Sequence, residues 1–161
     1  MNETTVTTKI REIISANRFF AGMKEDHLDF LVKNAHFTHT DSGEVLFRQG
    51  QPAKCFYLMI SGEVSVGVPA IQGPLLQLQE LSGGQMIGWS WLIDPYRWDF
   101  QASVISTAEL IEFNGEAILA HCENDNAFGY ELYKRFTGLM SERLTSARRK
   151  MMDQWEAPGF A

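Results

Sequence analysis

Closely spaced turn residues divide residues 37–112 into short apolar segments, and this pattern restricts the fold more than any other feature of the chain. Clusters of glycine, proline, serine and aspartate recur about every ten residues, at positions 41–43, 49–52, 61–62, 73–74 and 82–84. Val64, Val66 and Val68 alternate with Ser65 and Gly67, which is typical of a strand with one buried face. The pattern predicts a mainly β structure, a jelly-roll-like β-roll of antiparallel strands.

Helical periodicity appears on both sides of this segment. Ile10 and Ile14 in the N-terminal part, then Leu28 and Leu31 after an acidic start near Glu25, predict two helices. We therefore expect N-terminal helices over residues 1–36, a ligand-binding β-roll over 37–114 and C-terminal helices over 115–161.

The C-terminal part carries a long apolar stripe, for which Asp125 or Asn126 is the expected N-cap. Its members recur every three or four residues: Phe128, Leu132, Phe136, Met140, Leu144, Ala147, Met151 and Trp155. A helix of this length exceeds the average of about eleven or twelve residues, so it needs a surface to pack against. We favour a coiled coil in a homodimer; the alternative is a helix packed on its own roll.

Charge and composition exclude several classes of protein. The 14 Lys and Arg against 20 Asp and Glu give a net charge of −6, which argues against direct nucleic-acid binding. The longest apolar run, residues 55–60, is far too short to span a membrane. Cys55 and Cys122 are isolated in the sequence, as expected for reduced thiols in a cytoplasmic protein.

In residues 46–64 a turn glycine, Gly50, is followed by a small residue, Ala53, an apolar strand over 56–60 and a second turn glycine, Gly62. The order and spacing of these residues resemble the first signature of the cyclic-nucleotide-binding domain family, as found in bacterial regulators of the catabolite-activator class. Residues 81–88, which end in Gly88, resemble the approach to that family's phosphate-binding cassette. The resemblance implies a sensor domain in which helix amides and an arginine hold a cyclic phosphate, and a glutamate holds the ribose hydroxyl.

The cassette, residues 89–100, departs from the family pattern at the ligand-binding positions. Trp89 stands where the family has its glutamate, and an indole cannot accept a hydrogen bond. Depending on the alignment, Trp98 or Phe100 stands where the family has its arginine. Arg97 is the only basic residue between positions 88 and 104, so we expect it to contact the anion.

Three of the four tryptophans lie between positions 89 and 98. Either these rings fill the pocket and abolish binding, or they form an altered pocket for a flat ligand. We expect a pocket for cyclic AMP, cyclic GMP or another small anion, without a metal. The resemblance, together with the cassette, gives the candidate ligand-binding residues Val64, Leu78, Gln79, Gly88, Trp89, Ser90, Trp91, Arg97, Trp98, Phe100 and Arg148.

We expect a regulatory sensor domain and not an enzyme, since no nucleophile–base pair, phosphate-binding loop or pair of carboxylates is recognisable. Only residues 156–161 follow Trp155, so we expect no helix-turn-helix after the long helix. Such a sensor would act through a protein partner that the sequence does not identify. The alternatives are a ligand-free dimeric scaffold with a tryptophan-filled pocket, and a metal or haem-type redox sensor.

Overall fold

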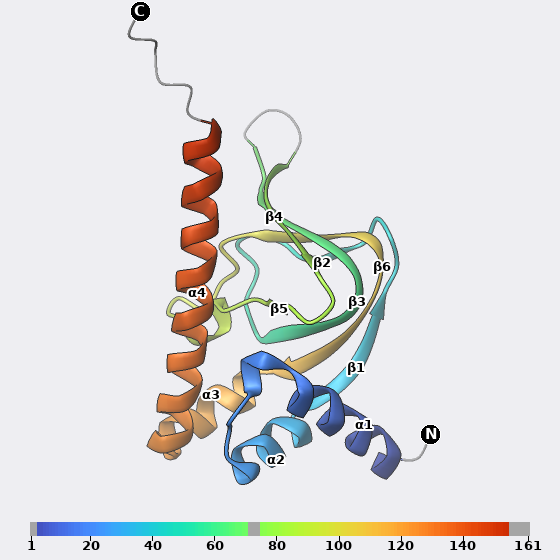
Figure 1. The fold of residues 1–161 in the computed structure, drawn as a ribbon, viewed down its shortest axis with the longest axis vertical. Coiled ribbons are helices and arrows are strands. Elements are labelled where there is room, and N and C mark those ends of the chain that lie inside the picture. Colours follow the sequence, from blue (N-terminus) through green and yellow to red (C-terminus); the bar gives the residue numbers. More distant parts are fainter. Residues whose placement is uncertain (1–2, 71–74, 155–161) are drawn as a thin grey trace, which may run out of the picture.

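The computed structural model describes residues 3–70 and 75–154 of the 161-residue chain (Figure 1). The turn predicted at Gly73 and Pro74, and Trp155 in the predicted helical stripe, lie outside the described residues. The elements follow in the order α1 (Glu3–Ala16), η1 (Arg18–Phe20), α2 (Glu25–Lys33), β1 (Ala35–Thr40), β2 (Val45–Phe47), β3 (Cys55–Val68), β4 (Leu76–Ser82), β5 (Met86–Ile87), η2 (Ser90–Leu92), β6 (Gln101–Asn114), α3 (Gly115–Asn124) and α4 (Asn126–Gln154).

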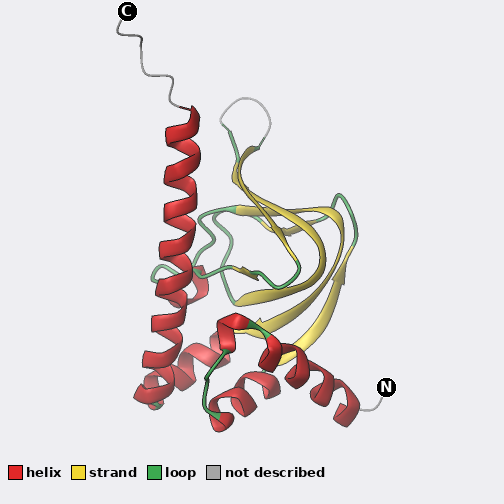
Figure 2. Cartoon of the chain, viewed as in Figure 1, coloured by secondary structure: helices red, strands yellow, loops and turns green. Residues whose placement is uncertain are grey.

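Within the described residues the strands form one six-stranded antiparallel sheet. Its order is β1-β6-β3-β4, while β2 pairs with β6 and β5 pairs with β3. The long strands β3 and β6 pair from Cys55 opposite Asn114 to Gly67 opposite Gln101, and they curve so that the sheet closes into a roll (Figure 2). The prediction of a mainly β fold, a jelly-roll-like roll with flanking helices, is confirmed.

The sequence pattern was misleading at Ser61 and Gly62, where it predicts a turn between two strands. The structure instead has one bent strand, β3, whose register against β6 shifts around these residues. Gly62 has a φ of +88°, and a Cβ atom there would lie 2.5 Å from the carbonyl oxygen of Thr107 in β6. The glycine therefore allows a bulge in which the two strands approach closely.

Helices α1, α2 and α3 gather at one end of the roll (Figure 2). Ile14 of α1, Leu31 of α2 and Ile118 of α3 are fully buried in the same apolar cluster as Phe56 of β3. The three parts of the chain expected from the sequence therefore share one hydrophobic core. Strand β1 begins at Ala35, slightly before the expected boundary at residue 37.

Helix α4 runs along one side of the roll (Figure 1). It is capped by Asp125, whose Oδ1 accepts a hydrogen bond from the backbone N–H of Phe128 at 3.0 Å. Phe128 and Phe136 are fully buried against their own chain, whereas Leu144 and Met151 are 72% and 71% exposed. The apolar stripe of the sequence thus divides into an intramolecular half and an uncovered half. None of the helices in the described ranges is both long and apolar enough to cross a membrane.

Candidate functional site

A cavity of about 220 Å³ lies inside the roll, beneath the cassette and against α4. Apolar side chains from the strands, from the cassette and from α4 form most of its wall. Its lining residues are Phe47, Val66, Leu78, Gln79, Leu81, Ile87, Gly88, Trp89, Ser90, Trp98, Phe100, Met140, Arg143, Leu144 and Ala147. The cavity therefore lies where the sequence predicts a ligand site, between the phosphate-cassette region and the long helix.

The structure brings together most of the candidate residues named from the sequence. Those that line the cavity are Leu78, Gln79, Gly88, Trp89, Ser90, Trp98 and Phe100. Strand β4 supplies the first two, and the segment between β5 and β6 supplies the others.

The remaining candidates lie outside the cavity wall. Val64 is fully buried in the core, opposite Val104 of β6. Trp91 is also a core residue, because its ring stacks on Phe56 with centroids 4.7 Å apart. Arg148 is exposed on α4.

Arg97 does not face the cavity, contrary to the role expected for it. Its guanidinium donates a hydrogen bond to the backbone carbonyl of Gly50 at 2.8 Å, and its backbone bridges to Pro52. The cassette loop is thereby joined to the β2–β3 connection, and the arginine side chain lies on the exposed side of the loop. Trp98, the next residue, is the one that turns inward.

Arg143 of α4 supplies the basic group of the cavity wall, and sequence reasoning missed it. Its Nη1 donates to Gln79 Oε1 and its Nη2 donates to the backbone carbonyl of Met86, both at 2.8 Å. Burial lowers the pKa of this guanidinium from its ordinary value, yet an arginine stays charged in a protein. Its spacing in the sequence could have identified it. Arg143 lies three residues after Met140 and four before Ala147, which places it on the helix face that meets the roll.

The cassette tryptophans have two different roles in the packing. Trp98 is almost buried and stacks on Phe47 with ring centroids 3.8 Å apart. It covers Gly88, where a Cβ atom would lie 2.8 Å from the indole ring. Trp89 is half-buried, and its ring meets Phe100 edge-on with centroids 6.3 Å apart. Trp98 is therefore a fixed wall, while Trp89 lies closer to solvent.

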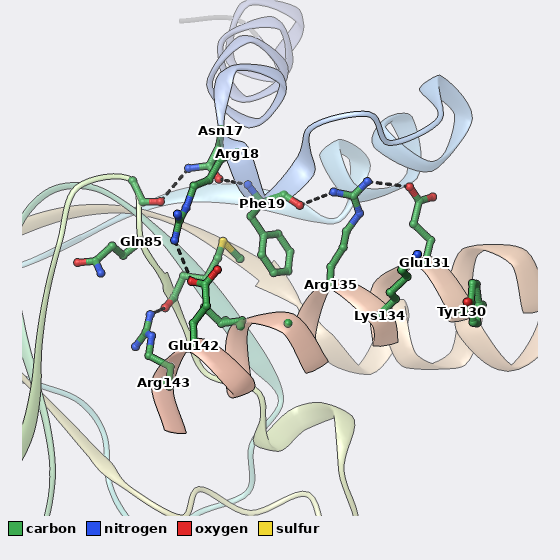
Figure 3. Close-up of a pocket in the computed structure, with 14 residues that line it drawn as sticks. Asn17, Arg18, Phe19, Gln85, Tyr130, Glu131, Lys134, Arg135, Glu142 and Arg143 are labelled. Atoms are coloured by element: carbon green, nitrogen blue, oxygen red, sulfur yellow. Dashed lines mark hydrogen bonds and ion pairs between the residues drawn. The ribbon is translucent and has the colours of Figure 1, made fainter. Parts of the chain in front are cut away.

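A polar groove of about 580 Å³ lies on the other side of Arg143, between the α1–η1 junction and α4 (Figure 3). Arg18 pairs with Glu142 across it at 2.9 Å, so the carboxylate next to Arg143 on the helix has a different partner. Deeper in the groove, burial opposes ionisation of Glu131, but hydrogen bonds from His27 and Arg135 outweigh this effect and lower the pKa of its carboxyl group. These contacts attach η1 and α2 to α4.

The cavity wall has a chemistry that suits a small anion with an apolar body. Among its described residues none is a carboxylate, and the polar side chains are Gln79, Ser90 and Arg143, besides the indole N–H groups of Trp89 and Trp98. A guanidinium binds anionic oxygens with charge-assisted hydrogen bonds. The described part of the chain contains no cluster of three or more His, Cys, Asp or Glu side chains that could hold a metal ion.

Comparison with solved structures shows the same fold in a cyclic nucleotide-binding domain and in two domains of regulatory proteins. The cyclic nucleotide-binding domain from Methylobacillus flagellatus is 16% identical with a TM-score of 0.76, over 94% of this chain and 85% of the other. The sensor domain of the Pseudomonas aeruginosa transcriptional regulator DNR is 18% identical with a TM-score of 0.69, over 96% and 98%. The regulatory domain of Toxoplasma gondii PKA, solved with cAMP, is 18% identical with a TM-score of 0.63, over 74% and 45%. At these identities the likeness is one of fold.

A curated relative, the acetyltransferase Pat of Mycolicibacterium smegmatis, is 35% identical over 75 residues. The match covers 47% of this chain and 22% of that protein, so it spans less than a quarter of the relative. The family model of the cyclic nucleotide-binding domain matches residues 37–125, more than half of the chain and nearly the whole roll with α3. The chain therefore belongs to the cyclic nucleotide-binding domain family.

Proposed function

We propose that this domain is a regulatory sensor that binds a small anionic ligand in the roll cavity and transmits its presence to α4. One observation carries the proposal: Arg143, the basic group of the cavity wall, belongs to the long helix itself. A ligand held by Arg143 therefore contacts the roll and α4 at once. The ligand shifts the equilibrium between positions of α4 by an amount set by the difference in its affinity for them.

The packing of α4 supports such a relay. Two turns before Arg143, the ring of Phe136 meets Phe56 of β3 and Trp91 of η2, with centroids 5.3 and 5.4 Å away. Trp91 belongs to the same short segment as Trp89 and Ser90, which line the cavity. The cassette and the helix are thus connected by direct aromatic contacts, through which a change at the cavity reaches the base of α4.

The ligand candidates are cyclic AMP, cyclic GMP and other small anions. Family membership supports the nucleotides, as does the structural likeness to the PKA regulatory domain solved with cAMP. The role proposed is regulatory and not catalytic, with signalling to a protein partner. A net charge of −6 supports the absence of direct nucleic-acid contacts.

Ligand binding is expected to raise the thermal stability of the domain. At a hundred times its dissociation constant, a ligand of the folded state adds about 2.7 kcal/mol to the free energy of unfolding. Thermal unfolding of the chain in the presence of cyclic AMP, cyclic GMP or one of a panel of small organic anions measures this stabilisation. Ala147 lines the cavity, and Ala147→Phe should fill the cavity and abolish the ligand-induced gain in thermal stability. Thr145→Phe, on the exposed side of α4, should preserve this gain. The absence of a shift with every ligand would contradict the proposal.

A ligand-free scaffold is the second candidate, and the position of Trp98 favours it. The indole stacks on Phe47 and occupies the space beside Gly88, where the resemblance to the family implies ligand contact. If Trp98 serves only to stabilise the fold, the panel leaves thermal stability unchanged while α4 still mediates assembly.

We further propose that an exposed stripe along α4, made of Tyr130, Thr137, Leu144 and Met151, forms a homodimer. Tyr130, Leu144 and Met151 are more than two-thirds exposed, and with Thr137 they recur every seven residues, the period of a two-stranded coiled coil. Met151→Glu is expected to weaken dimerisation by at least about a hundredfold, since juxtaposed like charges cost several kcal/mol. Sedimentation velocity measures the dissociation constant of the dimer. Thr145→Glu, next to the stripe, serves as the control, and a wild-type monomer at high concentration would refute the dimer.

The state of the two cysteines supports a cytoplasmic location for the proposed sensor. Cys55 and Cys122 are both free. Burial raises the pKa of each thiol to about 11, so both remain protonated and unreactive at neutral pH. Free, inert thiols are usual in a reducing compartment.

A further inference from the structure

We infer that the ligand of the roll cavity is a small apolar monocarboxylate, with its carboxylate on Arg143 and its body among the aromatic and aliphatic side chains of the roll. This inference rests on the proposed sensor function and specifies the chemical class of its ligand. Three observations carry it: the size of the cavity, the character of its wall and the charge state of Arg143.

The cavity is small. Its volume of about 220 Å³ lies below the roughly 300–1,000 Å³ of typical small-molecule sites. Trp98 limits it on the cassette side, because its ring is stacked on Phe47 and is only 5% exposed. Displacing a stacked, buried indole is costly, so we expect the ligand to fit the space as it stands.

The cavity wall offers few partners for a polar ligand. A cyclic nucleotide presents a phosphate, a ribose hydroxyl and a base with several hydrogen-bonding atoms. The described wall offers the side chains of Gln79, Ser90 and Arg143 and the indole N–H groups of Trp89 and Trp98. It has no carboxylate for the ribose, and Trp89 stands at the position expected for one. Polar groups left unpaired on binding cost affinity. A ligand with a single polar end and an apolar body avoids this cost.

Arg143 offers a binding group for an anion. Its guanidinium is half-buried, and among the described residues its hydrogen bonds go to neutral acceptors, the Gln79 amide and the Met86 carbonyl. Glu142, the adjacent carboxylate on α4, acts on Arg143 through its charge but accepts its hydrogen bond from Arg18. A partly buried guanidinium that is hydrogen-bonded to neutral groups gains from a directly bound anion. A single carboxylate can form a bidentate ion pair with the Arg143 guanidinium. In this pair a carboxylate oxygen replaces Gln79 Oε1 as the acceptor of the Nη1 hydrogen bond.

Calorimetric titration of the purified chain with matched acids and amides tests the assignment. The probes are octanoate and cinnamate, with octanamide and cinnamamide as uncharged controls of the same shape. We expect at least one acid to bind in the millimolar range or tighter, and its amide to bind at least tenfold more weakly. Arg143→Gln should reduce binding of the acid at least tenfold, whereas Arg148→Gln, an exposed arginine of the same helix, should leave it unchanged.

The outcomes separate this inference from the function it rests on. Equal binding of acid and amide by the wild-type chain overturns it, and this comparison needs no variant to fold. Unchanged binding by a folded Arg143→Gln variant also overturns it. Binding of cyclic AMP or cyclic GMP but of neither acid overturns the ligand class and leaves the sensor function in place. If neither the acids nor the nucleotides nor the other small anions of the panel bind, both the ligand class and the sensor function fail.

Discussion

Replacing Gly62 with alanine is expected to lower the free energy of unfolding by about 2 to 5 kcal/mol. The positive φ of +88° contributes about 1 to 2 kcal/mol of this loss, because an L-residue is strained in that region. Steric overlap contributes a further ~1 to 3 kcal/mol, since the new Cβ would lie 2.5 Å from the Thr107 oxygen and 2.6 Å from the Ala108 Cα. Both are backbone atoms of β6, which cannot move without disturbing the longest strand pair of the roll. Urea denaturation measures the change.

Gly43 provides the matched control for this prediction. It has the same φ of +88°, but among the described residues no atom beyond its two chain neighbours lies within 4 Å of where its Cβ would stand. Gly43→Ala is therefore expected to cost only the conformational part, about 1 to 2 kcal/mol. Equal losses for the two variants would show that the close approach of β3 and β6 at Gly62 contributes nothing.

Replacing Phe136 with alanine is expected to lower the free energy of unfolding by about 3 to 5 kcal/mol, the range for a large buried aromatic residue. Its side chain is fully buried. Its ring contacts Phe19 of η1 at 5.0 Å between centroids, and Phe56 and Trp91 at similar distances. The variant removes the contact through which the roll, the cassette and α4 meet. Chemical denaturation gives the stability, and hydrogen exchange should show faster opening of α4.

Thr145 lies on the same helix and is the control, because it is exposed and lies outside the proposed dimer stripe. Thr145→Ala is expected to change stability by no more than about 0.5 kcal/mol. If Phe136→Ala destabilises the domain without increasing exchange in α4, the ring is a general core residue. In that case the proposed relay does not pass through it.

The fold could be predicted because periodicity reports which face of each element is buried. The alternation of Val64 to Val68 and the regular turns predict the roll, and the three-to-four-residue stripe predicts α4. The pattern was wrong at Ser61 and Gly62 because a glycine that permits a bulge has the same local signature as one that permits a turn. Only the pairing of β3 with β6 distinguishes the two.

The candidate site was predictable in its location but not in its charged group. Residues of β4 and of the cassette are close in sequence and lie together in the cavity wall. Arg97 is also close in sequence, yet its side chain is held by Gly50 on the outside of the loop. Arg143 follows the cassette by more than forty residues, and α4 places it against Gln79 and Met86.

The sequence by itself determined the mainly β roll, the flanking helices and the family, because these depend on local periodicity and on short motifs in register. The tertiary structure alone decided which arginine reaches the cavity and which tryptophans fill the core. It also decided which half of the α4 stripe packs on the chain's own roll, burying Phe128 and Phe136 and leaving Leu144 and Met151 uncovered. The physical reason is that an apolar or basic side chain has the same local signature whichever surface it meets. Its partner is set by how the elements pack.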